Sequence, residues 1–250
     1  MKQKLGLIAI AVIVYCVFLV AKLPAEQILQ RVNLPSNINI TGVSGTLWSG
    51  RARQVNYQGL AIQDVKWQLS ALPLLWGAVW LELDAGNDRR ADQISIQGEI
   101  ATKLTNPMVV SSDDFLVYLP TDQVLANVSL PLPVMAGGRF RVTLQELDFD
   151  QQCEALNGTG EWLNASVMGT QGSIPLGVFK ADLSCTEGAI NAIVAEPNML
   201  GLSLNAQVKS MRDITVSGRF KLDPQLPQEV HDASQLFGQP GSDGYTEFRL

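Results

Sequence analysis

Residues 94–100 read Ile-Ser-Ile-Gln-Gly-Glu-Ile, and this stretch carries the pattern that decides the fold. Apolar and polar residues alternate along it, so an extended chain would present one apolar face and one wet face. The same alternation recurs at residues 65–69, 79–83, 140–144, 179–185, 202–208 and 214–220. Such alternation is typical of antiparallel sheets that are solvated on one side. The sequence therefore predicts a mainly β protein with an antiparallel sheet and a few short helices.

Glycine recurs on the apolar side of this alternation, as Gly98 within residues 94–100 and as Gly218 within residues 214–220. Glycine inside a strand weakens it and marks a bend or a close approach, and repeated on a concave face it lets a long sheet curl. We expect a curved, elongated sheet, either rolled over a filled core or open as an apolar groove. The groove would be lined by Ile94, Ile96, Gly98, Ile100, Val216, Gly218 and Phe220.

The first residues of the chain predict a membrane anchor. Residues 5–21 contain no charge and no proline. As a helix they would span roughly 25 Å, slightly less than the roughly 30 Å of a bilayer core. Lys2 and Lys4 make the short N-terminal side the more densely positive, which favours a cytoplasmic N-terminus. We expect residues 1–4 in the cytoplasm, a transmembrane helix at residues 5–23 and residues 24–250 beyond the membrane.

A cleaved signal peptide is the alternative to that anchor. Its usual marker is a pair of small residues just after the apolar run. Here the run ends Val-Ala-Lys-Leu-Pro at residues 20–24, which is a poor cleavage site. The sequence therefore favours an uncleaved anchor.

Turns and short helices interrupt the alternation at a few places. Residues 24–32 and 228–237 have helical spacing, the second stopping before Gly238, and residues 245–250 predict a last strand. Residues 72–77 read Leu-Pro-Leu-Leu-Trp-Gly and predict an apolar turn between two strands. That turn either plugs one end of the sheet or contacts a membrane surface. Prolines and glycines near residues 131–138 mark a possible internal seam.

Cysteine usage agrees with a domain outside the cytoplasm. Cys16 lies inside the apolar run, whereas Cys153 and Cys185 are the only cysteines after it. An even pair in an oxidising compartment predicts a disulfide, and two unpaired buried thiols are the alternative. The lone His231 lies too far away in sequence to give zinc-ligand spacing.

Charge and motifs argue against nucleic-acid binding and catalysis. The net charge is −6, whereas nucleic acid requires clustered Lys and Arg. No nucleophile elbow, zinc-protease motif or phosphate-binding loop occurs. We interpret His231 as a surface residue, the Asp113–Asp114 pair as a loop or helix start, and Asp148 with Asp150 as a polar strand end. Four Asn-x-Ser/Thr triplets keep a eukaryotic glycoprotein as a minor alternative: Asn39, Asn127, Asn157 and Asn164.

Residues 40–52 read Ile-Thr-Gly-Val-Ser-Gly-Thr-Leu-Trp-Ser-Gly-Arg-Ala. This segment resembles the opening motif of the type II secretion system protein N (general secretion pathway protein N) family, whose core would be Gly45, Thr46, Leu47, Trp48, Ser49 and Gly50. Further similarities follow in the family's order along nearly the whole chain. They are Trp67 with residues 72–77, Cys153 and Cys185 flanking residues 158–162, residues 198–202, residues 236–240, and Gly244 with Tyr245.

The resemblance implies an accessory, non-catalytic subunit in the inner membrane of Gram-negative bacteria, with a single membrane pass and a periplasmic domain. It implies a part in the export of folded proteins from the periplasm across the outer membrane. Partners would be other inner-membrane components of the machine and membrane lipid, with no cofactor, nucleic acid or small-molecule substrate. The strand–turn–strand unit at residues 65–83 is also loosely similar to AsmA-like proteins. That similarity implies the alternative function, a carrier of lipid or another apolar ligand in a β-groove.

Overall fold

The computed structural model describes residues 2–31, 37–57, 59–126, 135–210 and 213–249. Its helices are α1 (Lys2–Ala21), α2 (Ala25–Leu29), α3 (Ala71–Leu74), α4 (Thr121–Leu125), α5 (Gln228–Ser234) and the 3-10 helix η1 (Gln235–Phe237). Its strands are β1 (Ile38–Thr41), β2 (Ser44–Gly45), β3 (Ser49–Tyr57), β4 (Leu60–Leu69), β5 (Ala78–Ala85), β6 (Ser95–Lys103), β7 (Asn106–Ser112), β8 (Phe115–Pro120), β9 (Ala136–Asp150), β10 (Gln152–Gly169), β11 (Gly172–Thr186), β12 (Ala189–Val194), β13 (Ser203–Ser210), β14 (Asp213–Phe220) and β15 (Thr246–Arg249).

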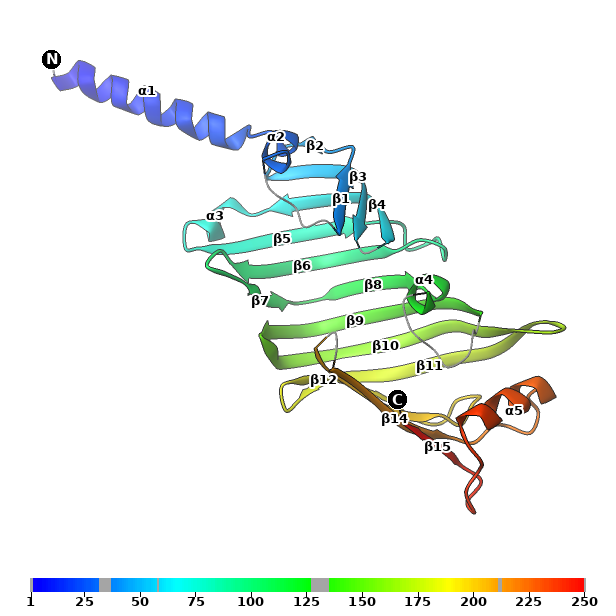
Figure 1. Ribbon diagram of the computed structural model, residues 1–250. Coiled ribbons are helices and arrows are strands. Elements are labelled where there is room, and N and C mark those ends of the chain that lie inside the picture. The colour runs from blue at the N-terminus through cyan, green and yellow to red at the C-terminus, as the bar shows by residue number, and fades with distance from the viewer. Residues whose placement is uncertain (1, 32–36, 58, 127–134, 211–212, 250) are drawn as a thin grey trace.

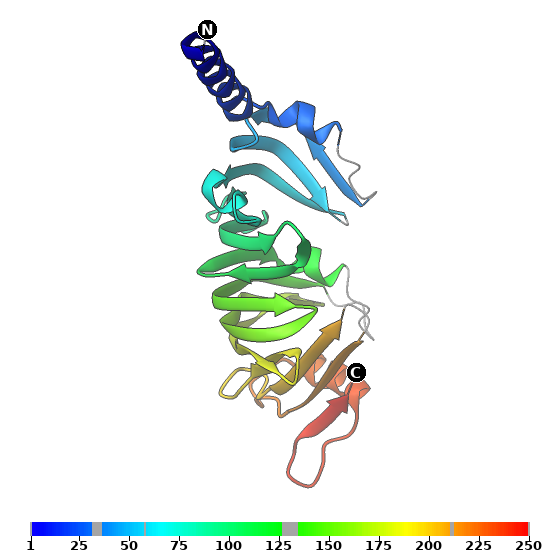
Figure 2. The same ribbon diagram turned by 90° about the vertical axis from the view of Figure 1, so that its left-hand side faces the viewer.

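One antiparallel sheet contains all of these strands, and its order follows the sequence from β1 to β15. Figures 1 and 2 show the strands stacked from the end near α1 to the end near the C-terminus. Each predicted alternating stretch lies within a strand, except that residues 94 and 202 immediately precede theirs. The mainly β, antiparallel prediction is therefore confirmed, because alternation is a local property that directly selects an extended chain with two unlike faces.

The strand position between β6 and β9 is filled by two short strands placed end to end. β7 pairs with β9 through residues 109–112, and β8 pairs with β9 through residues 115–120. The break falls at the Asp113–Asp114 pair, where Asp114 has a φ of 53°. At the break the Ser112 hydroxyl donates to the Glu99 carbonyl at 2.5 Å. The two aspartates therefore kink a strand, which agrees with their interpretation as a loop.

The core lies in the C-terminal part of the sheet. Its buried residues come from β10, β11 and the loop before α5: Ala165, Ile174, Leu176, Phe179 and Leu226. Beside it, Trp162 on β10 stacks on Phe179 of β11 and lies at a tilt against Phe140 of β9, with ring centroids 5.5 and 5.7 Å apart. These rings belong to cross-strand neighbours, and such aromatic pairs stabilise a sheet beyond their buried area.

The predicted short helices and the last strand are present. The expected helix at residues 24–32 is the shorter α2, the helix at residues 228–237 is α5 with η1, and Gly238 ends it with a φ of 135°. β15 is the predicted last strand. For the seam, Pro131 and Pro133 lie outside the described residues, and Gly137 and Gly138 lie within β9.

Helix α1 leaves the sheet at its N-terminal end and projects away from it (Figure 1). Side chains of residues 10–20 on α1 are exposed. Within the part of the chain that the structure describes, no helix reaches the length and apolar character needed to cross a membrane.

Candidate functional site

The motif at residues 45–50 joins α1 to the sheet. The Trp48 indole Nε1 donates to the Val20 carbonyl at 2.7 Å, near the end of α1. Next to it, the backbone N–H of Leu47 donates to the Leu23 carbonyl at 2.9 Å. Carbonyls in the last turn of a helix have no partner inside the helix, so outside donors are needed there. The motif supplies one donor to the last turn of α1 and a second to Leu23, two residues beyond it, and thereby fixes the junction.

The same motif is shaped to fit against β4. Ser49 N–H donates to the Thr46 hydroxyl at 3.1 Å, which closes the turn between β2 and β3. The Trp67 indole on β4 donates to the Leu47 carbonyl at 3.1 Å. A Cβ on Gly50 would overlap the Trp67 ring, so only glycine fits at this position. The polar groups of the motif are therefore used in hydrogen bonds that hold the turn and its contact with β4, which gives the motif a structural role.

The residues of the predicted groove lie in two separate parts of the sheet. Ile96, Gly98 and Ile100 lie on β6, and Ile94 is buried just before it. The other three, Val216, Gly218 and Phe220, lie on β14. Strands β7 to β13 separate the two sets in the order of the sheet. The structure therefore brings each set together on its own strand but does not bring one set beside the other.

The two glycines of these sets accommodate aromatic rings. A Cβ on Gly98 would lie 2.5 Å from Cδ2 of Phe115 on β8. A Cβ on Gly218 would lie 3.0 Å from Cζ of Phe248 on β15 and 2.6 Å from the Ser203 carbonyl oxygen. The distances of 2.5 and 2.6 Å are too short for a side chain and that of 3.0 Å is tight, so each glycine marks a close approach, as its place on the apolar face predicted.

An apolar cavity of about 550 Å³ lies between the C-terminal strands and α5. Phe220 of the predicted groove lines it, together with Leu202 on the loop before β13 and Val230 on α5. Glu229 is the charged residue at its border, and its carboxylate accepts from the Thr170 backbone N–H at 2.7 Å. Sequence reasoning missed the cavity as a site, although the amphipathic spacing at residues 228–237 was the signal for an apolar face there.

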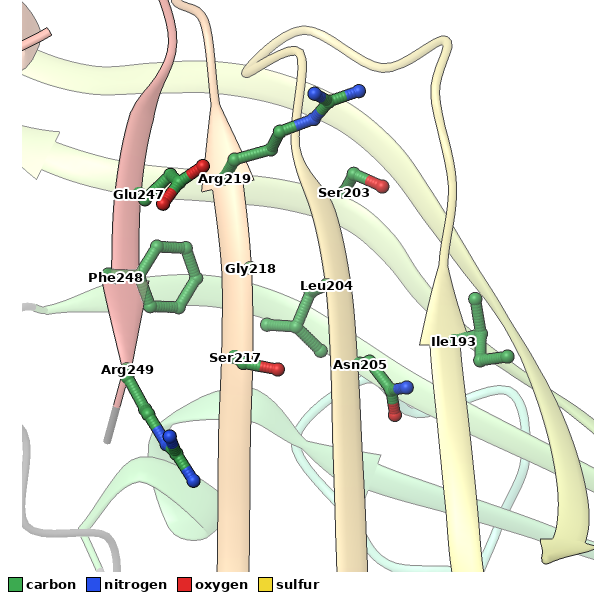
Figure 3. A pocket seen from close by; sticks show the side chains of 10 residues that line it. All are labelled: Ile193, Ser203, Leu204, Asn205, Ser217, Gly218, Arg219, Glu247, Phe248 and Arg249. Atoms are coloured by element: carbon green, nitrogen blue, oxygen red, sulfur yellow. The ribbon is translucent and has the colours of Figure 1, made fainter. Parts of the chain in front are cut away.

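A second hollow, of about 600 Å³, lies on strands β12 to β15 (Figure 3). Its polar row runs across neighbouring strands, because Asn205 pairs with Ser217 and Ser217 pairs with Arg249. Arg219 and Glu247 form the adjacent row. This hollow is open and mixed in charge, and no reactive constellation converges in it.

Cys153 and Cys185 form the predicted disulfide, with their Cα atoms 5.6 Å apart. Cys153 is only 4% exposed, and its N–H donates to the Gly188 carbonyl at 3.0 Å in the turn between β11 and β12. Cys16 on α1 is a free, exposed thiol. The pair therefore ties the β10 end to the β11–β12 turn and has a structural role.

The residues weighed for catalysis come from different elements, although the two aspartate pairs lie on neighbouring strands, because Ser111, two residues before Asp113, pairs with Asp148. His231 is half-buried on α5, Asp113 and Asp114 are exposed at the kink, and Asp148 with Asp150 ends β9. No group of His, Cys, Asp and Glu able to hold a metal ion occurs among the described residues. Asn39, Asn157 and Asn164 are exposed, and Asn127 lies outside the described residues.

Among the described ion pairs, the most enclosed lie on the central strands. Arg141 on β9 donates from Nε to the Glu161 carboxylate on β10 at 2.6 Å, and Lys180 on β11 lies 3.7 Å from the same carboxylate. The hydrogen bonds to Glu161, and then to Tyr118, raise the pKa of the Arg141 guanidinium above its ordinary value. These partners favour the charged form, so the cluster acts as a strand-to-strand ion pair.

Comparison with known proteins identifies one family. The family model described as Type II secretion system (T2SS), protein N matches residues 36–249. The type II secretion system protein N of Vibrio cholerae is 27% identical to this chain over 257 residues, covering 99% of this chain and 98% of that protein. The protein of the same name from Aeromonas hydrophila is 26% identical over 249 residues, covering 98% and 96%. No solved structure matches the chain.

Proposed function

The chain belongs to the type II secretion system protein N family, and we propose that it is a non-catalytic accessory subunit of a type II secretion system. The match of the family model over residues 36–249 carries this proposal. In this role the protein assists the export of folded proteins from the periplasm across the outer membrane. Its contribution is a surface on which other inner-membrane components of the machine assemble.

The proposal includes a single membrane tether, formed by α1, with residues 1–4 in the cytoplasm and the sheet in the periplasm of a Gram-negative bacterium. Three observations support this arrangement. Residues 5–21 carry no charge, apolar side chains of α1 such as Ile13 and Phe18 are more than 60% exposed, and the Cys153–Cys185 disulfide suits an oxidising compartment. The Trp48–Val20 hydrogen bond would then transmit the position of the tether to the sheet.

Assembly by strand addition is supported by the open ends of the sheet. Among the described strands, β1 pairs only with β3, and β15 pairs only with β14. β15 carries Glu247 and Arg249, and charges on an edge strand discourage uncontrolled pairing. β1 reads Ile-Asn-Ile-Thr and has no charge, so it is the better edge for a partner strand.

A deletion strain tests the secretion role. Export of a folded periplasmic substrate should fall when the gene is deleted and should recover with the wild-type chain. A variant with Thr41→Pro in β1 should recover less well, because proline removes a donor from the edge. The matched control is Ala91→Pro in the exposed loop between β5 and β6, which lies outside the strands. Normal export in the deletion strain, with unchanged levels of the platform proteins, would refute the proposal.

Carriage of lipid or another apolar ligand is the second candidate function, and the 550 Å³ apolar cavity favours it. Native mass spectrometry of the purified protein should then reveal a copurified lipid. Ala233→Trp, which fills part of the cavity lining, should reduce that signal, whereas Ala195→Trp on an exposed turn should not. If neither the wild-type protein nor the Ala195→Trp variant copurifies with lipid, this second function is refuted.

A further inference from the structure

A compact group of large apolar side chains is exposed at one end of strands β4 to β6. Leu72, Leu75 and Trp76, on α3 and the turn after it, are 71%, 75% and 79% exposed. Leu104, in the turn between β6 and β7, is 58% exposed. The Leu104 N–H donates to the Gly77 carbonyl at 2.9 Å, so the two turns are neighbours. We call these four residues the α3 patch. Adjacent exposed apolar residues of this size mark an interaction surface.

The α3 patch lies at the same end of the strands as the end of α1. The Trp48 indole contacts the Val20 carbonyl, and the Trp48 carbonyl accepts from the Leu69 N–H at 2.7 Å. Ser70 follows Leu69 and precedes α3 directly. A continuous set of hydrogen-bonded neighbours therefore leads from the helix end across β3 and β4 to the patch. Neighbouring strands lie about 4.8 Å apart, so the patch begins within about 10 to 15 Å of the helix end.

The direction of α1 brings this end of the strands towards the tether. Figure 1 shows α1 running in the general direction of the strands and leaving the sheet on the side where α3 lies. In Figure 2, where that side faces the viewer, α1 rises beyond the N-terminal edge of the sheet. With α1 across a bilayer, the strand ends that carry the α3 patch would face the membrane surface.

The charges around the patch fit a lipid surface. Residues 67–81 and 100–112 contain no Asp or Glu, although the chain as a whole has 24 of them. Lys103, next to Leu104, is exposed. At the opposite ends of β5 and β6, residues 86–94 carry Asp88, Arg89, Arg90 and Asp92 instead. A tryptophan with flanking leucines and a lysine is the composition that membrane–water interfaces favour.

We propose that the α3 patch is a second membrane contact, which inserts Leu72, Leu75 and Trp76 into the outer interface of the bilayer beside the tether. This inference rests on the proposed tether. A single helix leaves a domain free to rotate about the helix axis, and a second contact removes that freedom. The strands of the sheet would then stand with one end on the membrane, and the edge β1 would have a fixed orientation towards its partners.

The test uses the full-length chain in liposomes whose acyl chains are brominated. In a Cys16→Ala background, an environment-sensitive fluorophore is attached to Leu75→Cys or, as the matched control, to Ala91→Cys at the opposite strand ends. The disulfide-bonded cysteines do not react. We expect a blue shift and a loss of fluorescence for the probe at residue 75, and neither change for the probe at residue 91. A second probe is attached at Leu104→Cys. Its loss of fluorescence should be smaller when the chain also carries Leu72→Ser and Trp76→Ser than when it does not.

Flotation of the same vesicles separates failure of the patch from failure of the tether. If the protein floats with the vesicles but the probe at residue 75 is not quenched, the patch does not contact lipid, the present inference is overturned and the tether stands. If the protein does not float with the vesicles at all, the proposed tether fails and the membrane contact fails with it. Quenching at residue 75 without quenching at residue 91 supports the inference.

Discussion

Removing the Cys153–Cys185 disulfide should lower the stability of the C-terminal half by an amount that follows from the loop it closes. The two cysteines are 32 residues apart in sequence. On the chain-entropy account, closing such a loop raises the free energy of unfolding by about 3.7 kcal/mol. The last β10–β11 backbone pair on that side is Asn157 with Ser184, so beyond it the disulfide adds to the Cys153–Gly188 backbone hydrogen bond in holding the two segments together.

The assay compares wild type with Cys153→Ala, Cys185→Ala in urea and thermal unfolding, with and without a reducing agent. For a chain of this size, about 3.7 kcal/mol corresponds to a fall in Tm of about 7 to 15 °C. Reductant should lower the Tm of wild type but not that of the double variant, and Cys16→Ala should behave as wild type. A double variant that unfolds within about 0.5 kcal/mol of oxidised wild type would refute the reasoning, since this is the scatter of neutral substitutions.

Three further substitutions test other parts of the structure. Trp48→Phe removes one hydrogen bond, worth about 1 kcal/mol, and should broaden the spin-label distance distribution between α1 and β9. An unchanged distribution would contradict the role of Trp48 in fixing the junction between α1 and the sheet. Gly98→Ala should cost about 1 to 3 kcal/mol in urea unfolding because its Cβ meets an aromatic ring, whereas Gly160→Ala, with its nearest atom 3.7 Å away, should be nearly neutral; equal losses would contradict the close approach. Arg141→Met should cost about 1 to 2 kcal/mol by leaving the Glu161 carboxylate, 14% exposed, short of a partner, and a neutral result would dismiss the pair.

The strands could be predicted from the sequence because their signal is local. Alternation over residues 94–100 or 214–220 needs only neighbouring residues to select an extended chain with one apolar face. The helix at residues 228–237 could be predicted equally well, because its apolar residues have helical spacing and Gly238 marks its end. The family was recognisable too, because residues 45–50 combine turn formers and a tryptophan at fixed spacing, and the comparisons confirm it.

These local patterns could not predict which strands lie next to one another in the sheet. Nothing local tells that β6 and β14 lie far apart in the sheet, so residues such as Ile96 and Phe220 could be grouped by type but not placed side by side. The glycine positions predicted close approaches, yet Phe115 and Phe248, the rings that approach, belong to other strands. The cavity beside α5 depends on how β10, β11, β14 and β15 pack around that helix, which periodicity does not encode.

The junction formed by residues 45–50 shows why a motif without catalytic chemistry still needs particular residue types. Residues 5–21 offer almost no polar side chain, so backbone carbonyls at the end of α1 are what a neighbouring segment can bind. Tryptophan meets this need, because its indole is a donor only and its ring brings apolar area to the same place. Gly50 lets Trp67 lie over the turn and hold Leu47, which in turn holds Leu23. Each residue thus acts on the next towards the helix, so substitutions here should change the orientation of α1 before they unfold the sheet.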